Sequence, residues 1–136
     1  MNTNDPNLIL NTTDPILIPN VCFTLEPNDP KFIMQRKKNG FDESETWNLE
    51  RTVVMFVTPR LRMLVDRIVK NKAFPCGYYE CYTDWENDLL FVLNNFEEMI
   101  EVAKKGNFTD IWDEKNANNY RKAMELFGKI LPHLWD

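Results

Sequence analysis

The sequence predicts a mainly α-helical protein in which a three-helix bundle-like core follows an extended N-terminal arm. Apolar side chains recur every three or four residues over three long stretches, and turn and capping residues separate these stretches. Four tryptophans mark the edges of the stretches or the link between two of them: Trp47, Trp85, Trp112 and Trp135. We therefore divide the chain into an arm, residues 1–39, with short strands and a basic loop, and a helical domain, residues 40–136.

The first thirty residues are expected to be extended. Residues 2–10 and 11–19 each place an Asp-Pro pair before a short apolar run, and proline restrains its own backbone and that of its predecessor. The runs at 8–10, 16–18 and 21–25 are then short strands or arm segments. They pair as a small β element, or the arm packs on the helices or on another subunit as a route to a homo-oligomer.

A basic loop is predicted at the end of the arm. Arg36, Lys37 and Lys38 come directly before an Asn-Gly pair, which is a turn signal. The three cations are therefore placed at a loop tip.

The first helical stretch is expected to run from about residue 44 or 46 to residue 71. Either Asp42, with Glu45 three residues later, or Ser44 supplies the N-cap. Pro59 lies inside the stretch, where it either begins a second helix or kinks a single one. One apolar face continues in phase past Pro59 and favours the kink; its members are Trp47, Val54, Val57, Leu61, Leu64 and Ile68.

The other two helices have clearer ends. Residues 83–86 form a capping-box sequence at the start of the second helix, and Gly106 follows two lysines at its end. Its apolar face consists of Trp85, Leu89, Leu93, Phe96, Ile100 and Ala103. The third helix spans about residues 116–131, and Pro132 ends or bends it. Helices of these lengths, joined by short links, suit an antiparallel bundle.

Composition argues against catalysis and against a cofactor or metal. The three cysteines, Cys22, Cys76 and Cys81, lack the partner ligands of a zinc site, and His133 is the single histidine. Only four glycines are present, and no phosphate-binding loop is recognisable. Glu97, Glu98 and Glu101 form an acidic cluster on the second helix. The histidine that a di-iron site requires beside such glutamates is missing, so we interpret the cluster as a solvent-exposed face of the helix. No signal peptide or membrane-length apolar run is present, so a cytoplasmic protein without membrane contact is expected.

Charge is distributed unevenly along the chain. Residues 31–72 hold ten basic and five acidic side chains, whereas the segments on both sides are acidic and the whole chain carries −5. The basic middle segment either forms a binding face, or its positive charges pair with the negative charges of the other helices of the same chain. Nucleic acid is disfavoured as a ligand because the protein as a whole is acidic.

Binding of another protein is the function that the sequence favours. Aromatic and arginine side chains are the usual anchors of interfaces, and more aromatic residues are present than a three-helix core requires. The candidate binding residues are Arg36, Lys37, Lys38, Arg60, Tyr78, Tyr79 and Trp112. The alternative is a protein that binds or sequesters a small anionic nucleotide at a subunit interface.

Three patches of the sequence resemble a known family. They are residues 40–50 (GFDESETWNLE) continuing to 58–61 (TPRL), residues 84–97 beginning Asp-Trp-Glu and ending Phe-Glu, and residues 126–136 beginning Leu-Phe and ending Leu-Trp-Asp. In order and spacing they resemble a family of small, helical, uncharacterised proteins of tailed bacteriophages, over residues 40–136. The resemblance implies a phage accessory protein in the infected cell. The protein-binding function that the residues favour would then be to modulate or inhibit a host factor. The resemblance implies no catalytic or ligand-binding residue.

Overall fold

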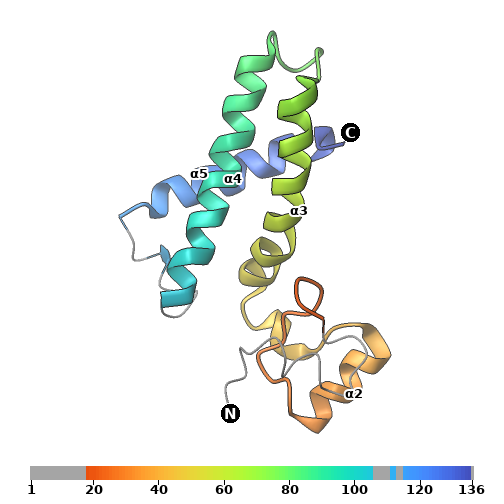
Figure 1. Ribbon diagram of the computed structural model, residues 1–136. Helices are drawn as coiled ribbons and strands as arrows, with labels where there is room; N and C mark the ends of the chain where they lie inside the picture. Colours follow the sequence, from red (N-terminus) through yellow and green to blue (C-terminus); the bar gives the residue numbers. More distant parts are fainter. Residues whose placement is uncertain (1–17, 106–110, 113–114, 136) are drawn as a thin grey trace. The chain divides into compact units, whose positions relative to one another are not determined.

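The structure, a computed structural model, describes residues 18–105, 111–112 and 115–135, and these are mainly helical (Figure 1). The elements are α2 (Pro30–Asn39), the 3-10 helix η1 (Glu43–Thr46), α3 (Leu49–Asn71), α4 (Tyr82–Lys105), α5 (Ala117–Ile130) and the 3-10 helix η3 (Leu131–His133). No strand occurs in these described ranges, so the predicted mainly α class is confirmed. Of the predicted arm strands, residues 8–10 and 16–17 lie outside the described residues, and residues 21–25 are irregular.

The chain divides into two compact units, Met1–Phe56 and Val57–Asp136. The division falls inside α3, so the boundary expected at residues 39 and 40 lies within the first unit. Each unit has buried side chains of its own.

The prediction of a basic loop before residue 40 is wrong, because these residues form α2. Asp29 caps the helix by accepting the backbone N–H two residues on, at 2.9 Å, and Pro30 occupies the first turn. Gly40 ends it with φ +83°, and its N–H donates to the carbonyl oxygen of Arg36 at 2.8 Å. The Asn-Gly pair thus terminates a helix rather than forming a hairpin turn, since glycine adopts the left-handed conformation that a helix C-terminus requires.

A buried ion pair organises the first unit. The guanidinium of Arg36 pairs with the carboxylate of Asp42, and both side chains have 0% exposure. Arg36 also donates to the carbonyl oxygen of Pro27 at 2.9 Å and to Thr24 Oγ1 at 3.1 Å. A buried charge requires a counter-charge and further hydrogen bonds, and here irregular backbone supplies them. The network therefore attaches residues 24–27 to the end of α2.

Asp42 also begins η1 through a capping box, as the sequence predicts for Asp42 and Glu45. The box caps this separate 3-10 helix, however, and the long helix α3 begins only at Leu49, later than the predicted residue 44 or 46. The carboxylate of Asp42 accepts the N–H of Ser44 at 2.8 Å, while the N–H of Asp42 donates to Glu45 Oε2 at 2.7 Å. The second oxygen of Glu45 accepts the N–H of Phe23 at 2.8 Å. Burial raises the pKa of Asp42, but hydrogen bonds from Ser44, Thr24 and Arg36 outweigh it and hold the pKa below its ordinary value.

α3 continues through Pro59 without interruption, so the alternative of two separate helices is excluded. The apolar side chains of its buried face are Val54, Leu61, Val65 and Ile68. The expectation that Trp47 begins this face is wrong, because 55% of its surface is exposed. Its ring packs edge-on against that of Phe32, with the ring centroids 5.7 Å apart. Trp47 lies between η1 and α3, where the helical spacing counted from the sequence does not apply.

The second unit holds the larger helical core, to which α4 contributes more buried apolar side chains than any other described element. In Figure 1, α3 and α4 run side by side in opposite directions, and α5 crosses them instead of running antiparallel. The buried apolar side chains of α4 are Trp85, Leu89, Val92, Leu93, Phe96 and Met99. The ring of Phe96 packs edge-on against that of Phe127 of α5, with the ring centroids 5.4 Å apart. The hydroxyl of Tyr120 of α5 donates a hydrogen bond to Glu98 Oε1 at 3.0 Å. Helical amphipathicity thus builds the core that the sequence predicts.

Candidate functional site

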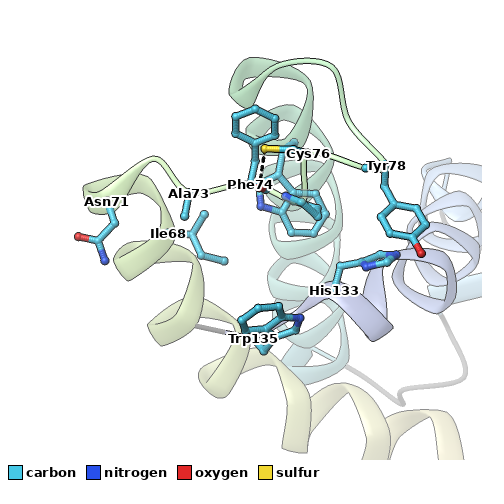
Figure 2. A pocket seen from close by; sticks show the side chains of 11 residues that line it. Ile68, Asn71, Ala73, Phe74, Cys76, Tyr78, His133 and Trp135 are labelled. Atoms are coloured by element: carbon cyan, nitrogen blue, oxygen red, sulfur yellow. Dashed lines mark hydrogen bonds between the residues drawn. The ribbon is translucent and has the colours of Figure 1, made fainter.

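A pocket of about 300 Å³ lies in the second unit, where the loop between α3 and α4 meets the C-terminal segment (Figure 2). Its walls come from the end of α3, the loop, the first turn of α4 and the segment after α5. The lining residues are Ile68, Asn71, Ala73, Phe74, Pro75, Cys76, Gly77, Tyr78, Trp85, His133 and Trp135. Concave, mainly apolar sites with a few polar groups are the usual form of a ligand site, and this volume is at their lower limit.

Aromatic rings dominate the pocket and differ sharply in exposure. Trp85 is 1% exposed and belongs to the core, whereas Trp135 is 75% exposed and Tyr78 is 73% exposed. Figure 2 shows the Tyr78 ring beside the imidazole of His133, with Phe74 and Cys76 on another side and Trp135 at the C-terminal edge. The ring centroids of Tyr78 and His133 are 3.9 Å apart. The pocket therefore has an aromatic floor and an exposed aromatic rim.

Local backbone geometry places these rings. Lys72 has φ +54° and ends α3 with an N–H bond to the carbonyl oxygen of Ile68 at 2.7 Å. The carbonyl oxygen of Pro75 then accepts the N–H groups of Tyr78 at 2.9 Å and of Tyr79 at 3.1 Å. This tight turn brings Tyr78 to the rim and turns the chain into α4.

At the other end of the chain, η3 aligns the C-terminal segment. Pro132 lies in its first turn and has no N–H to continue the hydrogen bonds of α5, so α5 ends and the short helix follows, as the sequence predicts. The N–H of Trp135 donates to the carbonyl oxygen of His133 at 3.1 Å. The short helix thereby places both an imidazole and an indole in the wall of the pocket.

Tyr79 supports the pocket from behind rather than lining it. Its hydroxyl donates to Asp88 Oδ2 at 2.5 Å, and its ring centroid is 4.9 Å from that of Trp85. Burial and the hydrogen bond to Asp88 raise the pKa of Tyr79 well above its ordinary value, so the hydroxyl stays protonated and donates at neutral pH.

Removal of the Tyr79 hydroxyl tests how much its hydrogen bond to Asp88 stabilises the fold. We expect Tyr79→Phe to lower the free energy of unfolding by about 1–2 kcal/mol, because Asp88 loses a donor while the ring contact with Trp85 remains. Urea denaturation monitored by circular dichroism measures this change. Tyr78→Phe is the matched control, since Tyr78 is 73% exposed and removal of its hydroxyl is expected to change stability by less than about 0.5 kcal/mol. Equal losses in both variants would contradict a specific role for the Tyr79 hydrogen bond.

The polar groups of the pocket are few and uncharged or weakly basic. Among the described lining residues, Asn71, Cys76 and His133 have hydrogen-bonding side-chain atoms besides the phenol and the indoles, and none is Lys, Arg, Asp or Glu. Cys76 Sγ donates to the carbonyl oxygen of Phe74 at 3.7 Å, and the described part of the chain contains no hydrogen bond between this thiol and His133. The arrangement thus offers binding surface, and no nucleophile–base pair forms at the thiol.

The predicted binding residues are not gathered into one site. Arg36 is fully buried in the first unit, so its assignment to an exposed basic cluster is wrong, whereas Lys37 and Lys38 are exposed in the last turn of α2. Arg60 is exposed on α3. The half-buried Trp112 lies under the guanidinium of Arg121, whose carbon is 5.0 Å from the ring centroid.

Of the predicted residues, Tyr78 lines the pocket and Tyr79 lies behind it. Sequence reasoning did not assign Phe74, His133 or Trp135 to a site. The available signals were the aromatic content of the loop and a tryptophan just beyond a helix-ending proline. Neither signal indicated that the two segments would meet.

The structure describes residues 18–105, 111–112 and 115–135. No group of three or more His, Cys, Asp and Glu side chains in those ranges could hold a metal ion. Among the helices described, none is both long enough and apolar enough to cross a bilayer. Comparison with known proteins gave no matching family model, no matching curated protein and no matching solved structure.

Proposed function

We propose that this protein is a non-catalytic binding module that holds another protein by anchoring one of its apolar groups in the pocket of the second unit. The observation that carries the proposal is the exposure of two large aromatic side chains, Trp135 and Tyr78, on the rim of a preformed pocket of about 300 Å³. Exposed aromatic residues around a concavity are typical of interface anchors, because they bury a large area at a small cost in side-chain entropy.

The charges of the site favour an apolar group of a protein over an anionic nucleotide. A nucleotide phosphate is usually held by arginine, lysine or a helix N-terminus, and His133 is the one side chain among the eleven lining residues that can become cationic. Lys37 and Lys38, the exposed cations of the predicted basic cluster, belong to the other unit. Nothing in the composition of the pocket therefore supports phosphate binding.

The resemblance to small phage proteins extends the proposal to a biological setting. In that setting the protein acts in the cytoplasm of an infected bacterium, and the partner is a host factor whose activity it modulates or inhibits. The resemblance is the ground for proposing a phage setting, whereas the pocket is the ground for proposing that a partner is anchored there.

A pull-down from bacterial lysate with a blocked pocket tests the proposal. A Cβ atom at Gly77 would meet no heavy atom within 4 Å, and the backbone there does not need glycine, so Gly77→Leu is expected to fold while it crowds the pocket. Gly128→Leu is the matched control, because Gly128 also has free space around a Cβ atom but does not line the pocket. We expect one stoichiometric partner with the wild type and with Gly128→Leu, and at least about a tenfold loss with Gly77→Leu.

The same experiment separates the pocket from the basic end of α2. The double variant Lys37→Glu/Lys38→Glu reverses two exposed charges without touching the buried Arg36 and is expected to retain the partner. Retention by Gly77→Leu together with loss in the charge-reversal variant would place the binding face on α2 and refute the pocket as the anchor site.

A further inference from the structure

We infer that the group accepted by the pocket is an uncharged aromatic ring with a hydrogen-bonding substituent, such as the side chain of a tyrosine or tryptophan. This inference rests on the proposed function and names the chemistry of the partner's anchor. It follows from three properties of the lining: its rings, the absence of Lys, Arg, Asp and Glu from its described residues, and the placement of its few polar groups.

The rings favour another ring as the occupant. Phe74, Tyr78, Trp85 and Trp135 line the same pocket, which also includes the apolar side chains of Ile68 and Pro75. Aromatic pairs in offset or edge-to-face geometry add stabilisation beyond the area they bury, so a planar aromatic group gains more here than an aliphatic group of equal size. The volume of about 300 Å³ suits one such ring system rather than an extended ligand.

The charges of the lining complement a neutral occupant. None of the eleven described residues that line the pocket is Lys, Arg, Asp or Glu, and His133 is the one among them with a basic side chain. An ammonium that entered would lose its hydration and find no carboxylate among these residues. A carboxylate or a phosphate would find the imidazole of His133 as its single basic partner there, so a charged group is disfavoured relative to a neutral one.

The polar groups lie where they can orient the ring. Asn71 is at the end of α3, and Figure 2 shows its amide at the opposite side of the pocket from His133 and Tyr78. A phenol or an indole has one polar atom on an otherwise apolar body, which suits a pocket with polar groups at separate points of its edge. An anchor of this type would satisfy its own polar atom while its ring lies among the aromatic side chains.

A series of small probes with one change at a time tests the inference. p-Cresol, the side-chain analogue of tyrosine, is titrated into the full-length protein, and the indole N–H signals of the four tryptophans are followed by NMR. We expect saturable shifts for Trp85 and Trp135, which line the pocket, and little change for Trp47 and Trp112, which do not. Gly77→Leu should abolish these shifts, and Gly128→Leu should preserve them.

The comparison probes decide the chemistry. Benzoate and benzylamine keep the ring and add a charge of either sign, and the saturated analogue of p-cresol keeps the hydroxyl without the aromatic ring. We expect each to bind at least about tenfold more weakly than p-cresol. Toluene, which lacks the hydroxyl, is expected to bind more weakly than p-cresol as well. Equal affinity of a charged probe would overturn the requirement for neutrality, and equal affinity of the saturated analogue would overturn the requirement for a ring.

Failure of this inference is distinguishable from failure of the proposed function. If Gly77→Leu loses its protein partner but p-cresol neither binds nor competes with that partner, the pocket anchors a protein through another chemistry and the inference is wrong. If p-cresol binds as expected while Gly77→Leu keeps the partner, the chemistry of the pocket stands and the proposed protein-binding role is wrong.

Discussion

Asparagine in place of Asp42 is expected to lower the free energy of unfolding by about 3–5 kcal/mol at neutral pH. The substitution keeps the shape of the side chain but removes the charge opposite Arg36, which is fully buried and has no access to water. The guanidinium would then remain in the interior without its counter-charge. Urea denaturation followed by circular dichroism and by the fluorescence of Trp47, the sole tryptophan of the first unit, measures the loss.

An exposed carboxylate one residue away provides the control. Glu43 lies 3.8 Å from the ammonium of Lys31, and both side chains are more than half exposed. Glu43→Gln is expected to change stability by less than about 1 kcal/mol, because water screens a surface pair. A similar loss for both variants would contradict the special role of the buried pair. The double variant Arg36→Met/Asp42→Asn should recover part of the stability lost by Asp42→Asn, since it removes the uncompensated charge.

Acid should remove the same stabilisation. The pKa of Asp42 is lower in the folded protein than its ordinary value of 3.8, so the unfolded state binds the proton more readily. The contribution is therefore complete above the ordinary pKa and is lost as the pH falls through the lowered value. We expect the stability difference between the wild type and Asp42→Asn to be largest at neutral pH and to shrink in acid below that range. A difference that does not depend on pH would contradict the assignment.

Phe96→Ala is expected to destabilise the second unit by about 3–5 kcal/mol. Phe96 is 0% exposed on α4, and its ring meets Phe127 of α5 edge-on, so truncation leaves a cavity and removes an aromatic contact between two helices. The midpoint of urea denaturation, monitored by circular dichroism, reports the loss. Met63→Ala is the control within the same unit, because Met63 is 68% exposed, and its effect should stay within about 0.5 kcal/mol.

Trp47→Ala distinguishes the exposed position of Trp47 in the structure from the buried position that the sequence spacing predicts. Spacing alone places Trp47 on the same kind of buried face as Phe96 and predicts an equally large loss. Because 55% of its surface is exposed and Phe32 is its aromatic contact, the expected loss is about 1 kcal/mol. A loss as large as that of Phe96→Ala would contradict the exposed position of the indole.

The helices of the second unit could be predicted closely because their signals are local. The capping sequence predicts a start of α4 at residue 83 and the two lysines predict its end, and the helix spans Tyr82–Lys105. The capping box at Asp42 is recognisable for the same reason, since its two hydrogen bonds join residues three apart. Periodicity, caps and terminators act within one or two turns and can be read without knowledge of the fold.

The helix α2 was not predicted, although the residues that mark its two ends lie next to it in the sequence. Asp29 and Pro30 mark its start and Gly40 marks its end, but the Asn-Gly pair is also the usual sign of a hairpin turn. The choice between a helix end and a hairpin turn depends on the residues after Gly40, where Asp42 lies within reach of Arg36 from the last turn of α2. Tertiary pairing therefore decided the burial of a cation that the sequence placed at the surface.

The sequence by itself determined the helical class, the ends of the later helices and most of the buried face of α4, because these follow from contacts between near neighbours. Only the tertiary structure decided which aromatic residues share a site. Tyr78 and Trp135 are far apart in the chain, and they line one pocket because a turn at Pro75 and the short helix at Pro132 bring two segments together. Their proximity depends on how α3, α4 and α5 pack, and no pattern in either segment encodes it.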